Sequence, residues 1–140
     1  MQIAILNGLE TSMISKLKKK LDTIFSLYIR LRYADINGYA ECYTCGVRKH
    51  YKELQCGHFQ SRKHLATRFD ETNCQTQCPS CNVFKYGEQY KFGQRLGKEV
   101  AESLLAKTRE RVKFTRSDYA EMISYYKKLV DNLKKEKGID

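Results

Sequence analysis

The chain has 140 residues, of which 41% are hydrophobic, and this is enough for one small domain with a modest core. Lys and Arg number 26 against 16 Asp and Glu, which gives a formal net charge of +10 at pH 7. This balance favours a polyanionic partner, nucleic acid above all. No apolar run approaches the roughly 20 residues of a spanning helix, so we expect no membrane insertion, although a basic helix on an anionic membrane surface is an alternative to nucleic acid.

The first residues indicate the cellular compartment. Residues 1–6 are apolar but lack a basic leading region, and Asn7-Gly8 follows at once. We therefore expect no signal peptide and a cytoplasmic location. In a reducing cytosol paired Cys-x-x-Cys motifs are typical of metal binding, with a redox dithiol or disulfides as the alternatives.

Residues 1–11 show no usable pattern; we interpret them as a loosely attached leader and assign them no function. Over residues 12–37 apolar side chains recur with a spacing of four and three, which predicts an N-terminal helix ending at Asn37-Gly38. Residues 38–87 hold all six Cys, all three His and four of the eight Gly, so short strands and knuckles are expected. They include a strand over residues 53–59 that carries His58, and a helix opening at Asn82.

We expect the C-terminal part of the chain, residues 88–140, to form helices. Residues 88–107 are helical in tendency but broken near Gly93 and Gly97. Thr115 and Asp118 have the spacing of a capping box, so a helix should begin there and run to about Lys137. Its apolar face is expected to pack on the N-terminal helix, with a dimer seam as the alternative. The whole chain is then a single domain.

Two cysteine pairs carry the strongest motif, and they are Cys42/Cys45 and Cys78/Cys81. Four thiolates in two knuckles can hold one Zn²⁺ tetrahedrally, and such a closed site is structural because it has no open position for water. The zinc would clamp the 32 residues between the pairs, with Asn82 directly after the last ligand.

His58 lies in this insert and is a candidate catalytic base. Phosphodiester hydrolysis needs a base for water and a cation for the developing charge. A neutral imidazole accepts a proton near physiological pH, and the side-chain oxygen of Asn82 is a hard donor suited to Mg²⁺ or Mn²⁺. A structural histidine is the alternative for His58 taken alone.

Four segments together resemble the phage NinG/Rap recombination family, which are small HNH-like (His-Me finger) proteins linked to resolving branched DNA. They are Cys42-Tyr-Thr-Cys45, Cys56-Gly57-His58-Phe59, Arg68-Phe69-Asp70-Glu71-Thr72-Asn73 and Gln77-Cys78-Pro79-Ser80-Cys81-Asn82. The resemblance implies an α+β fold in which a zinc-stabilised ββα (HNH/treble-clef-like) module at residues 38–87 is flanked by helices. It also implies a metal-dependent endonuclease that cuts four-way junctions during phage recombination, in the host cytoplasm.

By position, the resemblance also implies roles for single residues. His58 matches the first histidine of the HNH pattern, and Asn82 matches the final His or Asn. Asn73 matches the central asparagine and would brace the loop instead of reacting.

One position departs from the HNH pattern. Many HNH sites place an acidic metal ligand immediately before the first histidine, where this chain has Gly57. The missing ligand would then be His64 or Asp70, with Glu71 and Glu53 as further candidates. Asp70 is equally explained as a turn or salt-bridge residue.

Basic residues flank the proposed site in the sequence. They are Arg62, Lys63, Arg68, Lys85, Lys91 and Arg95. We expect them to bind DNA, with phosphate contacts favoured for Arg62, Lys63 and Lys85; a solvated surface is the alternative. Cys56 and Cys74 are expected to be buried small hydrophobes rather than a second metal site.

Two other functions compete with the endonuclease. One is a non-catalytic zinc-containing adaptor that binds nucleic acid, and the other is a protein-interaction scaffold built on the long helices. Symmetric cutting of a four-way junction needs two active sites, so the endonuclease hypothesis favours a homodimer joined through the helical apolar faces.

Overall fold

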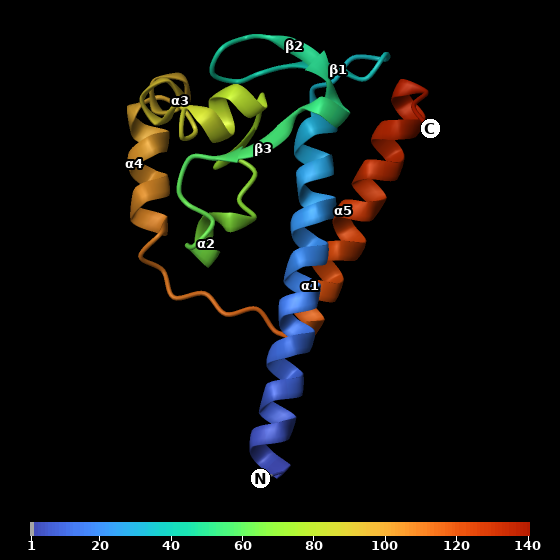
Figure 1. Ribbon diagram of the computed structural model, residues 1–140, viewed down its shortest axis with the longest axis vertical. Helices are drawn as coiled ribbons and strands as arrows, with labels where there is room; N and C mark the ends of the chain where they lie inside the picture. Colours follow the sequence, from blue (N-terminus) through green and yellow to red (C-terminus); the bar gives the residue numbers. More distant parts are fainter. Residues whose placement is uncertain (1) are drawn as a thin grey trace.

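The computed structural model describes residues 2–140, which form an α+β fold. Two long helices, α1 (Gln2–Arg32) and α5 (Arg116–Lys137), lie side by side, and the small strands and shorter helices lie on one flank of α1 (Figure 1). The shorter helices are α2 (Leu65–Arg68), α3 (Gln89–Leu96) and α4 (Lys98–Lys107). No helix of the described residues has the length and apolarity needed to cross a membrane.

Four short strands form two separate antiparallel pairs. β1 (Tyr39–Glu41) pairs with β2 (Arg48–His50), and β3 (Gln55–His58) pairs with β4 (Cys74–Gln77). A 3₁₀ segment, η1 (Tyr51–Glu53), lies between β2 and β3. The predicted strand that carries His58 is confirmed, although it is shorter than residues 53–59.

The helix expected to open at Asn82 is much shorter than a ββα module requires. It is a π-helical segment of five residues, η2 (Ser80–Phe84). It ends because Tyr86, Gly87 and Glu88 all adopt positive φ angles, of 53°, 86° and 49°. Such left-handed residues cannot continue a right-handed helix.

α1 differs from its prediction at both ends. It begins at Gln2, so the described part of the segment expected to be a loosely attached leader is the first part of this helix. Side chains such as Ile3 and Leu6 are 75% and 63% exposed, and a helix that packs on nothing shows no apolar period. At the other end α1 stops at Arg32 instead of residue 37, and the Asp35 carboxylate accepts the backbone N–H groups of Asn37 and Tyr39, both at 2.9 Å.

The main core lies between α1 and α5, as predicted. Its buried members are Leu21, Phe25, Ile29, Cys74, Tyr119, Ile123 and Tyr126. The capping box that starts α5 is present, with the Asp118 N–H donating to Thr115 Oγ1 at 3.1 Å and the Thr115 N–H to Asp118 Oδ2 at 2.8 Å. The two apolar faces are thus buried against each other within one chain, which leaves little of them for a dimer seam.

Only one of the two expected glycine breaks occurs. Gly97, at φ 92°, separates α3 from α4, whereas Gly93 lies inside α3. A Cβ on Gly93 would lie 3.2 Å from Cε1 of Phe59, so the absence of a side chain lets that ring pack closely on the helix.

The Glu71 carboxylate connects the segment before β4 to both long helices. Its Oε1 accepts from the Tyr28 hydroxyl at 3.0 Å and its Oε2 from the Tyr126 hydroxyl at 2.9 Å. Burial and the negative Glu71 raise the pKa of both phenols, so both remain protonated donors. Arg32 Nη1 donates to the Glu71 carbonyl at 3.1 Å.

Tyr126→Phe is expected to lower the free energy of unfolding by about 1–2 kcal/mol, because it removes a hydrogen bond to a carboxylate. The matched control is Tyr125→Phe, which alters a neighbouring tyrosine that is 56% exposed. Urea unfolding of the zinc-loaded proteins measures both changes. Equal midpoints for the two variants would contradict this role for Glu71.

Candidate functional site

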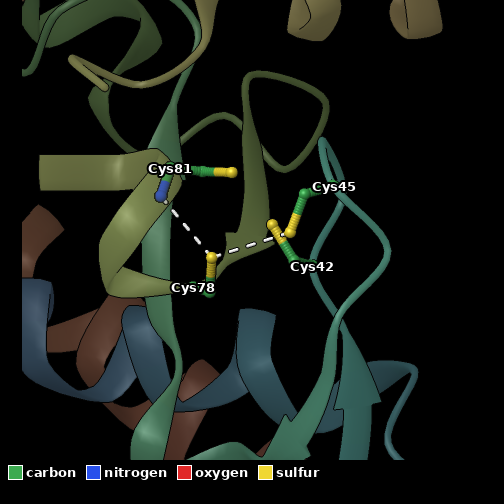
Figure 2. Close-up of side chains that lie close together, drawn as sticks. All are labelled: Cys42, Cys45, Cys78 and Cys81. Carbon is green, nitrogen blue, oxygen red and sulfur yellow. Dashed lines mark hydrogen bonds between the residues drawn. The ribbon is translucent and has the colours of Figure 1, made fainter. Parts of the chain in front are cut away.

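Four cysteines gather between the β1–β2 turn and η2. Cys42 and Cys45 lie between β1 and β2, Cys78 follows β4, and Cys81 is part of η2. Their Sγ atoms all lie within 4.8 Å of one another (Figure 2). The Cys45 and Cys78 sulfurs are 3.8 Å apart, close to the edge of a ZnS₄ tetrahedron with bonds of about 2.3 Å. The cluster can therefore bind zinc.

The electrostatics of the cluster also fit a cation. Burial raises the pKa of Cys42, but hydrogen bonds from the Thr44 hydroxyl and from backbone N–H groups outweigh it and lower the pKa to about 6. Burial and the neighbouring thiols raise the pKa of Cys81 to about 12. Thiols this close hinder one another's ionisation, and a bound dication removes that hindrance.

A cavity of about 390 Å³ lies between α1 and β3, close to this cluster. Its walls are formed by Asp22, Phe25, Ser26, Arg30, Leu54, Gln55, Cys56, His58, Arg62 and Asn82. Two of the residues singled out from the sequence as catalytic, His58 and Asn82, thus share one cavity. We call it the His58 cavity.

His58 ends β3, and its ring orientation is fixed by a backbone carbonyl. Nε2 lies 2.9 Å from the Arg68 carbonyl oxygen. A carbonyl only accepts, so Nε2 carries the proton and Nδ1 keeps its lone pair. Burial, with the positive charges of Arg62 and Arg68, lowers the pKa of His58 and keeps the ring neutral at pH 7.

Asn82 lines the cavity beside Gln55. Its Nδ2 donates to Gln55 Oε1 at 2.8 Å, while its own Oδ1 accepts no hydrogen bond from the described residues. The Asn82 N–H donates to the Cys78 carbonyl at 2.9 Å, so the cysteine cluster fixes its backbone. Gln55 was missed because one glutamine in a strand carries no signal of its own.

Asn73 is fully buried and does not line the cavity. Its Oδ1 accepts the Gln60 N–H at 2.7 Å, and its Nδ2 donates to the carbonyls of Gln60 and Thr67 at 3.1 and 3.0 Å. These bonds close the loop that joins β3 to β4. The side chain holds the loop and has no donor or acceptor left for substrate.

The packing around position 57 leaves no room for a side chain and so requires glycine. A Cβ there would lie 1.9 Å from Oε1 of the buried Gln77, which donates to Thr44 Oγ1 and to the Gly87 carbonyl. Side chains alternate along a strand, so position 57 also faces away from the sheet face that carries His58. An acidic residue at this position could not enter the His58 cavity.

The acidic candidates named from the sequence lie elsewhere. Asp70 Oδ2 pairs with Lys107 Nζ at 2.6 Å, Glu71 is bound by the two tyrosines, and Glu53 is exposed outside the cavity. His64 precedes α2 and does not line the cavity either. Asp70 and His64 therefore lie outside the His58 cavity, and the ligand roles expected of them stay predictions.

The carboxylate that does line the cavity is Asp22 of α1. It pairs with Arg62 at 3.0 Å and accepts from Nε and Nη2 of Arg68. Sequence reasoning missed it because α1 precedes the cysteine module and no local spacing links the two. The sequence feature that could have pointed to Asp22 is its position as an acidic residue directly after a segment with four lysines.

The predicted DNA-binding residues differ in their exposure and ion pairing. Arg62 is 57% exposed at the cavity, and Lys63 and Lys85 are exposed and without an ion pair among the described residues. Arg68 is only 13% exposed and is held by Asp22, so little of its side chain is open to a phosphate, and its expected DNA contact stays a prediction.

The other two basic candidates lie away from the His58 cavity. Lys91 pairs with Glu88 at 3.4 Å, and the Arg95 guanidinium lies over the Tyr43 ring at 4.2 Å, beside a different cavity. Arg30 is the basic residue of the His58 cavity that sequence reasoning missed.

The fold and site define a small α+β protein in which a four-cysteine centre able to bind zinc adjoins a cavity containing histidine, arginine and amide side chains. A family model described as Bacteriophage Lambda NinG protein matches residues 10–136, and the chain belongs to this family. Comparison with curated proteins and with solved structures gave no significant match.

The lowered pKa of His58 predicts a pH effect on stability. The imidazole of an unfolded chain titrates near pH 6.5, whereas that of the folded chain titrates at a lower pH. As the pH falls below 6.5, the unfolded chain binds the proton more readily than the folded chain, so the free energy of unfolding decreases. This decrease ends once the pH is below the folded pKa. NMR titration should place His58 below 6.5, and His58→Gln should make the loss of stability shallower. A His58 that titrates above 6.5 would contradict the assignment of burial as the dominant effect.

Proposed function

We propose that the protein is a metal-dependent HNH-type endonuclease that hydrolyses phosphodiester bonds in branched DNA, four-way junctions in particular, during phage recombination in the host cytoplasm. One observation carries the proposal. His58, with a free Nδ1 lone pair, shares a cavity with Asn82 and with two arginines, Arg30 and Arg62. Membership of the NinG family supports the recombination context.

His58 acts as the general base. Its neutral ring accepts a proton at Nδ1 from the attacking water, and the Arg68 carbonyl at Nε2 stabilises the imidazolium that results. The same hydrogen bond prevents the ring from turning. The nearby Asp22 carboxylate favours the protonated ring and opposes the effect of burial.

The arginines bind the scissile phosphate. Arg62 is exposed at the mouth of the cavity, and Arg30 is held in place because its Nη1 donates to the Tyr51 carbonyl at 2.8 Å. Guanidinium groups hydrogen-bond phosphate in bidentate fashion and offset charge that develops in the transition state. The exposed Lys63 and Lys85 extend this positive surface along the DNA.

The cavity also has hard oxygen donors suited to Mg²⁺ or Mn²⁺. They are the amide oxygens of Asn82 and Gln55 and the carboxylate of Asp22. A divalent cation held there would supply charge stabilisation to the leaving oxygen. Zinc in the four-cysteine site has no open position and holds the structure only.

A homodimer fits this substrate, because two symmetric cuts need two active sites. The first turns of α1 extend past the start of α5 (Figure 1), with Ile3, Leu6 and Leu9 more than half exposed. Residues 2–15 have Glu10 as their single charged side chain in a chain of net charge +10, so two copies can meet there without repulsion. We propose this segment as the dimer contact.

A non-catalytic adaptor that binds branched nucleic acid is the second candidate. It is favoured by one observation: the carboxylate in the cavity, Asp22, is already engaged by two arginines. The basic surface and zinc module then serve binding alone.

Cleavage of labelled linear, flapped and four-way-junction DNA separates the two candidates. In Mg²⁺ or Mn²⁺ the wild type should cut the junction, and His58→Ala should be slower by about 100-fold or more. His50→Ala is the matched control, because His50 lies on β2 outside the cavity. Junction binding without cutting by the wild type would favour the adaptor, and full activity of His58→Ala would overturn the role of His58.

Arg62→Ala should weaken junction binding for all base sequences alike and reduce the salt slope of log affinity by about one, the effect of one lost phosphate contact. Lys128→Ala is the control, since it removes an exposed charge on α5. Fluorescence anisotropy over a range of salt concentrations measures both. An unchanged slope for Arg62→Ala would remove Arg62 from the DNA path.

A further inference from the structure

A second group of metal-ligating side chains lies on the β3–β4 pair. Cys56 and His58 are two residues apart on β3 and so share one face, and Cys74 of β4 pairs directly with His58. Both sulfurs and a ring nitrogen of His58 lie within 4.8 Å of one another. This group shares no residue with the four-cysteine cluster.

A single carbonyl already directs two of these groups to one point. The His58 Nε2–H donates to the Arg68 oxygen at 2.9 Å, and the Cys74 thiol donates to the same oxygen at 3.5 Å. Cys74 is fully buried, whereas Cys56 is partly exposed and lines the His58 cavity. The cavity therefore gives a cation a path from solvent to Cys56 and His58, and the Cys74 sulfur lies within 4.8 Å of both. Cys74 belongs to the main core and Cys56 packs against it, as expected of small hydrophobes, and the two thiols also converge with His58.

We propose that Cys56, His58 and Cys74 form a second metal site for a thiophilic divalent cation such as Zn²⁺ or Co²⁺. Two thiolates and an imidazole are a donor set that these ions accept, and a three-ligand site leaves one coordination position open. Binding displaces the two thiol protons into solvent and forms two metal–sulfur bonds and one metal–nitrogen bond. No group is oxidised or reduced.

Occupancy of this site disables His58 as a base, a consequence that rests on the proposed function. A cation on Nδ1 uses the lone pair that would accept the proton from water. A cation on Nε2 displaces the proton there, and the neutral ring then carries its proton on Nδ1. In both cases no acceptor remains, so a thiophilic cation inhibits an enzyme that Mg²⁺ or Mn²⁺ activates.

The site is tested by titrating the zinc-loaded full chain, with its thiols reduced, with Co²⁺ alone. Zinc is held more tightly than cobalt and stays in the four-cysteine site. We expect one Co²⁺ per chain with a thiolate-to-cobalt charge-transfer band, lost in Cys74→Ala and in Cys56→Ala and retained in His50→Ala. Absence of the band in the wild type overturns the site, and so does a band that survives both cysteine substitutions. If Cys74→Ala does not fold by circular dichroism, Cys56→Ala decides.

Inhibition is measured on junction DNA with Zn²⁺ added beyond one equivalent. Wild-type cleavage should fall by about 100-fold, the scale of a lost general base, while Cys74→Ala, compared with its own rate without added zinc, should lose little. A wild type that binds Co²⁺ but is not inhibited overturns the regulatory half. A wild type that cuts no DNA contradicts the proposed function instead, and the cobalt spectrum still decides the metal site.

Discussion

The structure depends on bringing two cysteine pairs together across the 32 residues that separate them. Neither β-pair is longer than four residues, and an isolated two-stranded pair is marginal in water. A zinc ion bound by Cys42, Cys45, Cys78 and Cys81 would close the loop that contains β2, β3, α2 and β4. It would also fix Asn82, the residue next to the last ligand, opposite the strand that carries His58.

The other wall of the cavity comes from α1, which has two roles. One face of this helix packs on α5, with Phe25 and Ile29 in the core. Asp22, Ser26 and Arg30 of the same helix line the His58 cavity. Arg68 connects the two parts, because its side chain binds Asp22 and its carbonyl orients His58. Hydrogen bonds thus link α1 to His58 through one residue, Arg68.

The sequence predicted those features that have a local signal. The cysteine spacing indicated the metal cluster, the apolar period indicated the α1–α5 packing, and Thr115 and Asp118 marked the start of α5. Features set by contacts between distant segments were missed, such as Asp22 and Gln55 in the cavity and the engagement of Arg68. The first turns of α1 were missed for another reason: an apolar period reports burial, and a helix in solvent has none.

Zinc is expected to hold the cavity together, while the two long helices are stabilised by their own packing. Hydrogen–deuterium exchange with mass spectrometry, before and after zinc is removed with a strong chelator, separates the two contributions. We predict loss of protection over residues 42–58 and 74–84, with retention over the core residues of α1 and α5 and recovery when zinc is restored. Unchanged protection around His58 and Asn82 in the zinc-free chain would contradict this role of zinc.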